Sequence, residues 1–341
     1  MIEQGEQPQI STDNVVTGEL MKPWQLPWQR MPWQLLCRSF KQQNLAHAFV
    51  VEGGEGHATT DFVTVFTQLL HCQQLTSESE YPHSQQPCQR CHCCRQIAGS
   101  VYPDFKIVEL LEGKKQISVD QVRELTNFFQ QSAHGQGFRV LLIKDAELMT
   151  HAAMNAILKT LEEPGNNSLL FLQTNHPLSL TATIRSRCLK LSFIQVNDDE
   201  VISWLNSFND NHLATDQLRQ LLLMSDNHPI KALSLLQTNA LETRSEIIDK
   251  FYACLSSECT IDQFLSTSKE ADINQLWAWI GQEIMNKGNT AIRNSNFRIS
   301  LSTLYFSLQK QLFASNHVDK WTLLREFLIK SIANSAILSH S

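Results

Sequence analysis

Five of the nine cysteines in this chain of 341 residues lie between positions 72 and 94. The stretch "CQRCHCC" spaces Cys88, Cys91 and Cys94 as C-x2-C-x2-C, so that tight turns can aim the sulfurs at one ion. Zinc completes a tetrahedron with four such ligands, and we expect Cys72, which follows the helical stretch "FTQLLH", to be the fourth. Four thiolates leave no open coordination position, so the predicted zinc is structural.

Other residues near these cysteines leave alternatives open. The same run also begins the bacterial iron–sulfur pattern, but that pattern needs a further cysteine and then a proline, and "CRQIAGS" supplies neither at the required spacing. Cys93 is out of step with the run and is expected to be a spare thiol. His71, His83 and His92 are reserve ligands.

A glycine-rich loop lies between an apolar run and a helical stretch in "VVEGGEGHATTDF" (50–62). Gly53, Gly54 and Gly56 give it the look of a phosphate-binding loop, in which a lysine and then a serine or threonine follow the last glycine. Here His57 and Ala58 follow instead, and a neutral imidazole cannot replace an ammonium group that reaches the phosphates. The loop is an unusual phosphate site, a chance cluster, or the remnant of a site that no longer hydrolyses a nucleotide.

Strand-length apolar runs alternate with amphipathic helices between residues 35 and 195. The runs are "AFVVE" (48–52), "FKIVELL" (105–111), "RVLLIKD" (139–145), "SLLFLQT" (168–174) and "CLKLSF" (188–193). One helix, 151–163, begins after Thr150 as a helix cap and ends at Pro164-Gly165. Continuous apolar strands separated by helices predict an α/β fold with a parallel five-stranded sheet covered on both faces.

The rest of the chain divides by composition and periodicity. We predict a mobile N-terminal tail over residues 1–30, an α/β domain over 31–195 with the zinc module (72–94) inserted, and a small helical domain over 196–238. Longer amphipathic stretches predict an all-α bundle over 239–341.

Three Pro-Trp-Gln triplets mark the end of the predicted tail, at 23–25, 27–29 and 32–34. Prolines at this spacing argue against a continuous helix. Large aromatic side chains are usually buried. We therefore expect an extended segment whose tryptophans pack on the domain, in preference to a peptide-recognition motif.

The overall charge and hydropathy exclude some classes of protein. A formal net charge of −6 argues against a global nucleic-acid-binding surface. No apolar run approaches the ~20 residues of a membrane span, and the polar start "MIEQGEQPQISTD" is unlike a secretory signal. The sequence predicts a cytoplasmic protein without membrane contact, where thiols bind metal in preference to forming disulfides.

Two further motifs resemble those of a known family. "MNAILKTLEEPG" (154–165) and "TIRSRC" (183–188) are similar to motifs of the clamp-loader branch of the AAA+ ATPases, N-A-L-L-K-x-L-E-E-P-P and T-I-x-S-R-C. The inserted cysteine run narrows the resemblance to the bacterial DNA polymerase III clamp loader. The resemblance covers about residues 31–235, and it implies an AAA+ P-loop-type sheet, a helical lid domain and an all-α collar domain.

The family includes motor subunits (gamma/tau) that hydrolyse ATP and a subunit that keeps the fold without ATPase function. Three positions favour the second kind. The lysine and the Mg²⁺-ligating residue of the loop fall at His57 and Ala58. The metal-holding carboxylate falls at Lys144, with Asp145 in the place of the water-activating glutamate, and a shift of one residue leaves no glutamate there. The lid arginine falls at Ile230. We therefore predict that the chain binds no nucleotide and has no ATPase activity of its own within the polymerase holoenzyme.

The resemblance implies a catalytic role for Arg187 of "TIRSRC". In this family the arginine projects into the ATP pocket of a neighbouring motor subunit, as a finger in trans, and Ser186 and Cys188 complete the motif. A planar guanidinium with permanent charge suits the γ-phosphate oxygens as charge builds during transfer. The alternative for Arg187 is a plain surface ion pair.

The resemblance thus implies a fixed subunit of a clamp-loading ring. Its partners would be the gamma/tau and delta subunits and, through the complex, the sliding clamp and primer–template DNA. Two alternatives stay open at this point. An active gamma/tau-like ATPase would bind nucleotide alone, and a stand-alone zinc-dependent nucleic-acid-binding protein would bind DNA with a steep salt dependence.

Overall fold

The chain forms two compact units, residues 1–234 and 235–341, with the boundary inside helix α10 (Pro229–Gln237). The computed structural model describes residues 20–76, 85–130, 137–193, 197–269, 273–285, 295–314 and 319–339. The further division of the first unit into an α/β domain and a lid domain stays a prediction.

A parallel five-stranded sheet forms the centre of the first unit, which confirms the predicted fold class. Its strands are β1 (Ala48–Glu52), β2 (Phe105–Val108), β3 (Arg139–Ile143), β4 (Ser168–Thr174) and β5 (Leu189–Ser192), in the order β2-β3-β4-β1-β5. Every neighbouring pair is parallel. Parallel neighbours need crossover connections, which the intervening helices supply.

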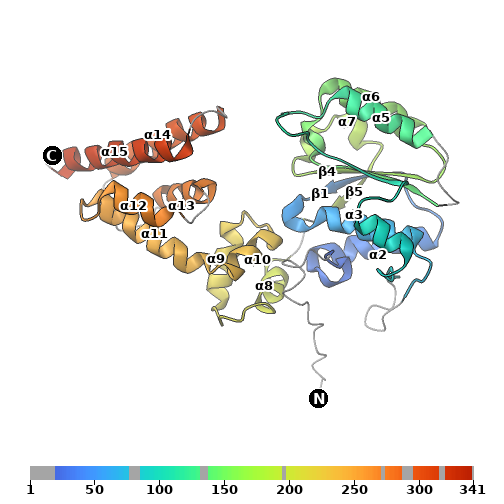
Figure 1. Ribbon diagram of the computed structural model, residues 1–341, viewed down its shortest axis with the longest axis horizontal. Helices are drawn as coiled ribbons and strands as arrows, with labels where there is room; N and C mark the ends of the chain where they lie inside the picture. Colours follow the sequence, from blue (N-terminus) through green and yellow to red (C-terminus); the bar gives the residue numbers. More distant parts are fainter. Residues whose placement is uncertain are drawn as a thin grey trace, which may run out of the picture. The chain divides into compact units, whose positions relative to one another are not determined.

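Helices cover both faces of this sheet (Figure 1). The helices before, between and after the strands are α2 (Pro27–Lys41), α3 (Thr59–His71), α4 (His92–Ala98), α5 (Val119–Gln130), α6 (His151–Glu162) and α7 (Ala182–Arg185). Two more helices, α8 (Asp198–Asn206) and α9 (Thr215–Met224), follow the last strand and do not form these layers. The 3₁₀ turns are η1 (Pro23–Gln25), η2 (Glu55–His57), η3 (Ala146–Leu148) and η4 (Pro177–Ser179). Thr150 caps α6 as expected, because its hydroxyl accepts a hydrogen bond of 3.1 Å from the N–H of Ala153. Figure 1 shows α5, α6 and α7 on one face and α2 and α3 on the other.

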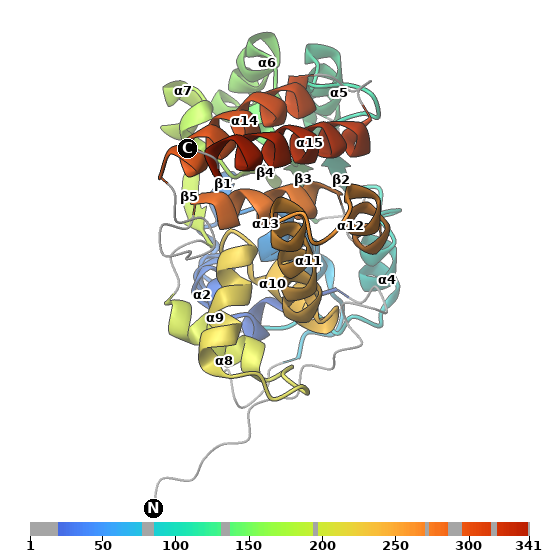
Figure 2. The same cartoon turned by 90° about the vertical axis from the view of Figure 1, so that its left-hand side faces the viewer.

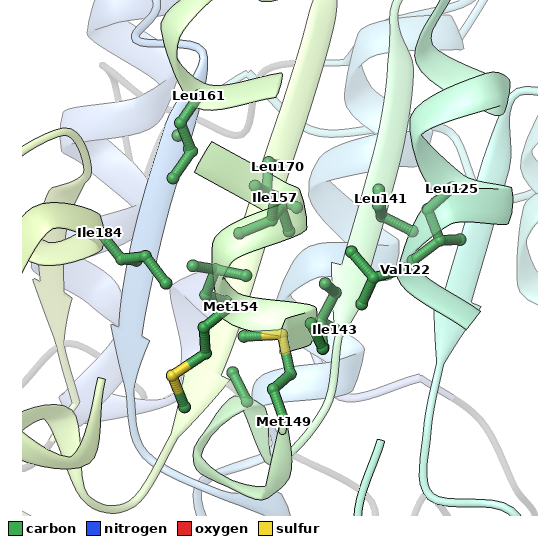
Figure 3. Close-up of a cluster of buried hydrophobic side chains, with 14 of the residues drawn as sticks. Val122, Leu125, Leu141, Ile143, Met149, Met154, Ile157, Leu161, Leu170 and Ile184 are labelled. Carbon is green, nitrogen blue, oxygen red and sulfur yellow. The ribbon is translucent and has the colours of Figure 1, made fainter. Parts of the chain in front are cut away.

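The two faces of the sheet bury different side chains. On one face, Leu141 and Leu170 belong to a cluster that α5, α6 and α7 complete (Figure 3). On the other face, the rings of Phe49 and Phe171 stack with their centroids 5.1 Å apart, and Phe66 of α3 meets Phe171 edge-on. Burial on both faces explains why the central strands β1, β3 and β4 read as continuous apolar runs.

The extended segment predicted at the Pro-Trp-Gln triplets is wrong, because η1 and α2 run through it. Pro27 starts α2, where a missing N–H costs nothing, but Pro32 lies inside the helix. Trp24, Trp28 and Trp33 are buried, as expected. A buried aromatic side chain removes about 150–250 Å² from water, which stabilises the fold by roughly 4–6 kcal/mol. The burial of the three tryptophans therefore outweighs the cost of about 3 kcal/mol for a proline inside a helix. Residues 1–19 of the predicted tail lie outside the described residues.

The second unit is helical, as predicted. It contains α11 (Ala240–Leu255), α12 (Ile261–Ser268), α13 (Ile273–Met285), α14 (Ser295–Ala314) and α15 (Lys320–Ser339). Helices α14 and α15 lie side by side in both views (Figures 1 and 2). Phe251 of α11 stacks on Phe327 of α15 with centroids 6.3 Å apart, at the centre of the bundle. Among the described residues, no helix is both long enough and apolar enough to span a membrane.

Candidate functional site

The glycine-rich loop joins β1 to α3 through two residues with positive φ. Gly53 has a φ of +142°, and Ala58 has a φ of +54°, a left-handed conformation that costs a non-glycine residue about 1–2 kcal/mol. The hydroxyl of Thr59 is 2.9 Å from the carbonyl oxygen of Gly53 and 3.0 Å from that of Gly54, and it donates to them. The loop therefore satisfies part of its own polar backbone with a neighbouring side chain.

Two histidines pack together against this loop. His57 is 5% exposed, and the centroid of its ring lies 5.0 Å from that of His228. A β-carbon added to Gly56 would lie 2.5 Å from Cδ2 of His228, so this approach requires glycine. The segment before α10 thus packs directly on the loop. Burial, and to a lesser degree the charge of His228, lowers the pKa of His57 to about 4, so its ring is neutral at pH 7.

The buried ring of His57 should make folding stability depend on pH. Its pKa is about 4 in the folded chain against 6.5 without the surroundings of the fold. Stability is fully present above pH 6.5, and it is lost as the pH falls toward 4, because only the unfolded chain then binds the proton. Between pH 7 and pH 5 this amounts to about 2 kcal/mol.

Urea denaturation of the native chain and of His57→Gln at the two pH values measures this loss. The native chain should lose more free energy of unfolding than the variant, while any release of metal at pH 5 affects both proteins alike. Equal losses would contradict a buried neutral ring at position 57.

Helix α2 holds the loop through the second Pro-Trp-Gln triplet. The indole N–H of Trp28 donates to the carbonyl oxygen of His57 at 2.9 Å, and Nε2 of Gln29 donates to those of His57 (2.7 Å) and Ala58 (2.8 Å). The ring of Trp28 also meets Trp204 of α8 edge-on, with centroids 4.9 Å apart. This triplet therefore has a structural role that the sequence alone did not predict.

The positively charged side chain of Lys144 lies directly after β3, at the position where the resemblance expects a metal-holding carboxylate. Nζ of Lys144 forms an ion pair with Glu55 of the loop and lies 3.2 Å from Oε2 of Glu109. Burial works to lower the pKa of Lys144, but the two carboxylates outweigh it and raise that pKa. Asp145 follows, and burial, together with the nearby charge of Glu147, raises its pKa. A divalent cation here would meet an ammonium group, which opposes its binding.

The "TIRSRC" motif exposes its second arginine. Nη2 of Arg187 lies 2.8 Å from Oε1 of Glu162, and Nη1 donates to the carbonyl oxygen of Thr183 at 3.1 Å. The hydroxyl of Ser186 donates to the same carbonyl at 3.0 Å, which tightens the turn. Cys188 packs against the buried cluster, and burial raises the pKa of its thiol to about 12, so it is no nucleophile at neutral pH.

The four predicted metal ligands lie together. The Sγ atoms of Cys72, Cys88, Cys91 and Cys94 all lie within 4.8 Å of one another. A zinc–thiolate tetrahedron with bonds of about 2.3 Å has edges of about 3.8 Å, so the group needs only a small contraction. The N–H of Cys88 donates to Sγ of Cys72 at 3.2 Å, and that of Cys91 donates to Sγ of Cys88 at 3.3 Å. This donor set could hold a metal ion.

Among the described residues, the spare thiol Cys93 and the reserve ligands His71 and His92 are not part of this group. Cys93 lies outside the cluster. Nδ1 of His71 is 3.1 Å from the hydroxyl of Tyr102, and His92 is exposed. His83 lies outside the described residues.

Comparison with known proteins connects this geometry to a family. Residues 28–197 match the family described as "DNA polymerase III, delta subunit". The "DNA polymerase III subunit delta'" of Haemophilus influenzae is 28% identical over 254 residues, which cover 74% of each chain. That of Escherichia coli is 30% identical over 221 residues, which cover 65% of this chain and 64% of the relative. The chain is therefore a relative of DNA polymerase III clamp-loader subunits, and the two relatives just described are both named delta-prime.

Delta-prime proteins are not the only matching relatives. The "DNA polymerase III subunit tau" of Bacillus subtilis is 25% identical over 175 residues, 51% of this chain and 29% of that one. Relatives with different subunit names thus match this chain. The names of the relatives therefore do not decide whether this chain can use ATP, and the side chains of the glycine-rich loop and Lys144 bear on that question.

Several residues of the site were missed by sequence reasoning. Glu55 lies inside the loop that the sequence singled out, but its acidic side chain was given no role. Glu109 and His228 are far along the chain from the residues they contact, and no local pattern marks them. Glu162 lies inside the motif at 154–165, but its contact with Arg187 was not predicted. Ile230, predicted at the lid arginine position, lies half-buried in the first turn of α10.

Proposed function

We propose that this chain is a non-hydrolysing, delta-prime-type subunit of the bacterial DNA polymerase III clamp loader, and that Arg187 acts in trans on ATP bound by a neighbouring gamma/tau subunit. Its other partners are the delta subunit and, through the assembled complex, the sliding clamp and primer–template DNA in the cytoplasm. The ion pair between Lys144 and Glu55 carries the proposal.

This ion pair joins the two positions that face nucleotide in a working site. Lys144 stands where Mg²⁺ would be held, and Glu55 belongs to the loop that would surround the phosphates. Binding of ATP with Mg²⁺ would break this ion pair. The ammonium group of Lys144 would then face Mg²⁺, and the carboxylate of Glu55 would face the phosphates. Like charges about 4 Å apart repel by roughly 4 kcal/mol at an effective dielectric constant of 20. The neutral ring of His57 offers no compensating charge.

The exposure of Arg187 supports the second half of the proposal. Its side chain retains 36% of its accessible surface, and its partner Glu162 retains 53%, so the guanidinium can meet another molecule without local unfolding. An exposed ion pair of this kind contributes at most about 1 kcal/mol to stability. A more favourable partner, such as a triphosphate, can therefore compete for the guanidinium.

We also propose that the cysteine cluster holds a structural zinc ion. Cys72 ends α3, whereas Cys91 and Cys94 lie at the start of α4, so the metal would tie two helices together. Nε2 of Gln68 on α3 already donates to the carbonyl oxygen of Cys94 at 2.8 Å, which aligns the same two helices. The ion would supply no reaction chemistry, because four thiolates fill its coordination sphere.

Reconstitution with altered motor subunits tests the proposed function. Gamma/tau subunits whose own Ser-Arg-Cys arginine is replaced by alanine depend on any remaining finger from another chain. Clamp- and DNA-stimulated ATP hydrolysis by such a complex should require the present chain. Hydrolysis by this chain alone would establish the active ATPase instead, and salt-sensitive DNA binding without partners would favour the stand-alone binding protein.

A further inference from the structure

The guanidinium of Arg187 is held within its own chain at two different nitrogens. Nη2 meets the carboxylate of Glu162 at 2.8 Å, and Nη1 meets the carbonyl oxygen of Thr183 at 3.1 Å. Two contacts on different nitrogens fix the plane of the group as well as its position. Most of its N–H donors still remain available for oxygens of another molecule.

Both contacts come from helices that are anchored in one core. Glu162 ends α6 directly after Leu161, which is buried, and Thr183 on α7 directly precedes Ile184, which is also buried. Figure 3 shows Leu161 and Ile184 directed into the same cluster of apolar side chains. Because packed cores hold side chains in fixed positions, the fold sets the distance between Glu162 and Arg187.

The position of Glu162 is unfavourable for its own helix. A carboxylate at a helix C-terminus faces the negative end of the helix dipole. Glu163 carries the same charge at the same end of α6, but none of the contacts described for Arg187 involves it. The two glutamates therefore form a matched pair that differs in contact with Arg187.

We infer that Glu162 is a positioning residue for Arg187, and this inference rests on the proposed function. Its carboxylate holds the guanidinium in the orientation in which it enters the neighbouring ATP site. A long side chain that is already ordered loses less conformational freedom on docking. The effect of Glu162 should therefore be seen in the rate of ATP hydrolysis by the complex and not in the stability of the chain, because an exposed ion pair adds little to folding stability.

The experiment uses the reconstituted complex in which only this chain supplies a finger. Four variants are compared with the native chain: Glu162→Ala, Glu162→Gln, Glu163→Ala and Arg187→Ala. Glu162→Ala should lower kcat about three- to ten-fold with an unchanged KM for ATP, since ATP binds to the neighbour. Glu162→Gln keeps an oxygen acceptor and should lose less, and Glu163→Ala should match the native chain.

Any result that differs from these expectations shows whether the role of Glu162 or the proposed function itself is refuted. If Glu162→Ala and Glu163→Ala behave alike while Arg187→Ala is inactive, the finger stands and the positioning role of Glu162 is refuted. Faster turnover in Glu162→Ala would also overturn it, because the carboxylate would then compete with the phosphates. Unchanged turnover in Arg187→Ala would remove the proposed function itself. Gel filtration and thermal melting of each variant establish that the complexes assemble and the chains fold.

Discussion

Replacing Arg187 with alanine should abolish almost all ATP turnover at one site of the reconstituted clamp loader, while the complex still assembles. Arginine fingers supplied in trans are typically worth on the order of 10³–10⁵ in rate. The guanidinium acts on charge that develops in the transition state, so the loss should appear in kcat and leave ATP binding by the neighbour nearly intact. Single-turnover hydrolysis with clamp and primed DNA measures it.

Two controls separate the finger from a general loss of charge. Arg187→Lys keeps the charge but lacks the planar fork, so it should also be severely impaired. Arg123→Ala removes a more exposed arginine, which pairs with Asp120 at 3.4 Å on α5, and should leave turnover unchanged. Turnover that survives in Arg187→Ala would reduce the Arg187–Glu162 contact to the plain ion pair that the sequence left as an alternative.

Removal of one cysteine ligand should empty the proposed zinc site. Cys91→Ser replaces a thiolate with a poor ligand, and the chain should fall from about one zinc ion to almost none. Structural zinc contributes apparent binding free energies on the order of 10–16 kcal/mol in zinc-finger peptides, so its loss should greatly destabilise the segment 72–94. Metal analysis and limited proteolysis measure the two effects.

The neighbouring cysteine gives a matched control for this substitution. Cys93→Ser changes the same kind of side chain two residues away but outside the cluster, and it should retain zinc and resist protease like the native chain. When ATP turnover is corrected for the amount of folded chain in the complex, neither variant should change the turnover that depends on Arg187. Unchanged metal content in Cys91→Ser would show that the ligand set is wrong.

The sheet could be predicted from the sequence largely because the three central strands β1, β3 and β4 are buried on both faces. The runs at 48–52 and 168–174 were predicted to the residue, since strand and apolar run coincide there. The run at 105–111 continues past the end of β2 at Val108, because apolar character alone does not mark where strand pairing stops. Thr150 was also predictable, since capping is a local hydrogen bond.

The path through the Pro-Trp-Gln triplets could not be predicted. Proline chemistry is local, and it argued for an extended segment. The tryptophans pack on residues far along the chain, as Trp28 does on Trp204, and tertiary burial outweighs the cost of Pro32.

The candidate site likewise has parts that the sequence predicted and parts that it did not. Local spacing indicated the cysteine cluster and the position of Arg187. The partners Glu55 and Glu109 of Lys144, and the partner Glu162 of Arg187, lie far away in sequence, so only the fold brings them together.

The most direct test of the account is calorimetric titration of the purified chain with ATP and Mg²⁺. The central claim is that the Lys144–Glu55 pair and the neutral His57 leave no place for a triphosphate. We expect no binding heat at millimolar ATP, with a motor subunit measured in parallel as the positive control. A saturable heat with one ATP per chain, lost when a residue of the 53–58 loop is substituted, would contradict the account.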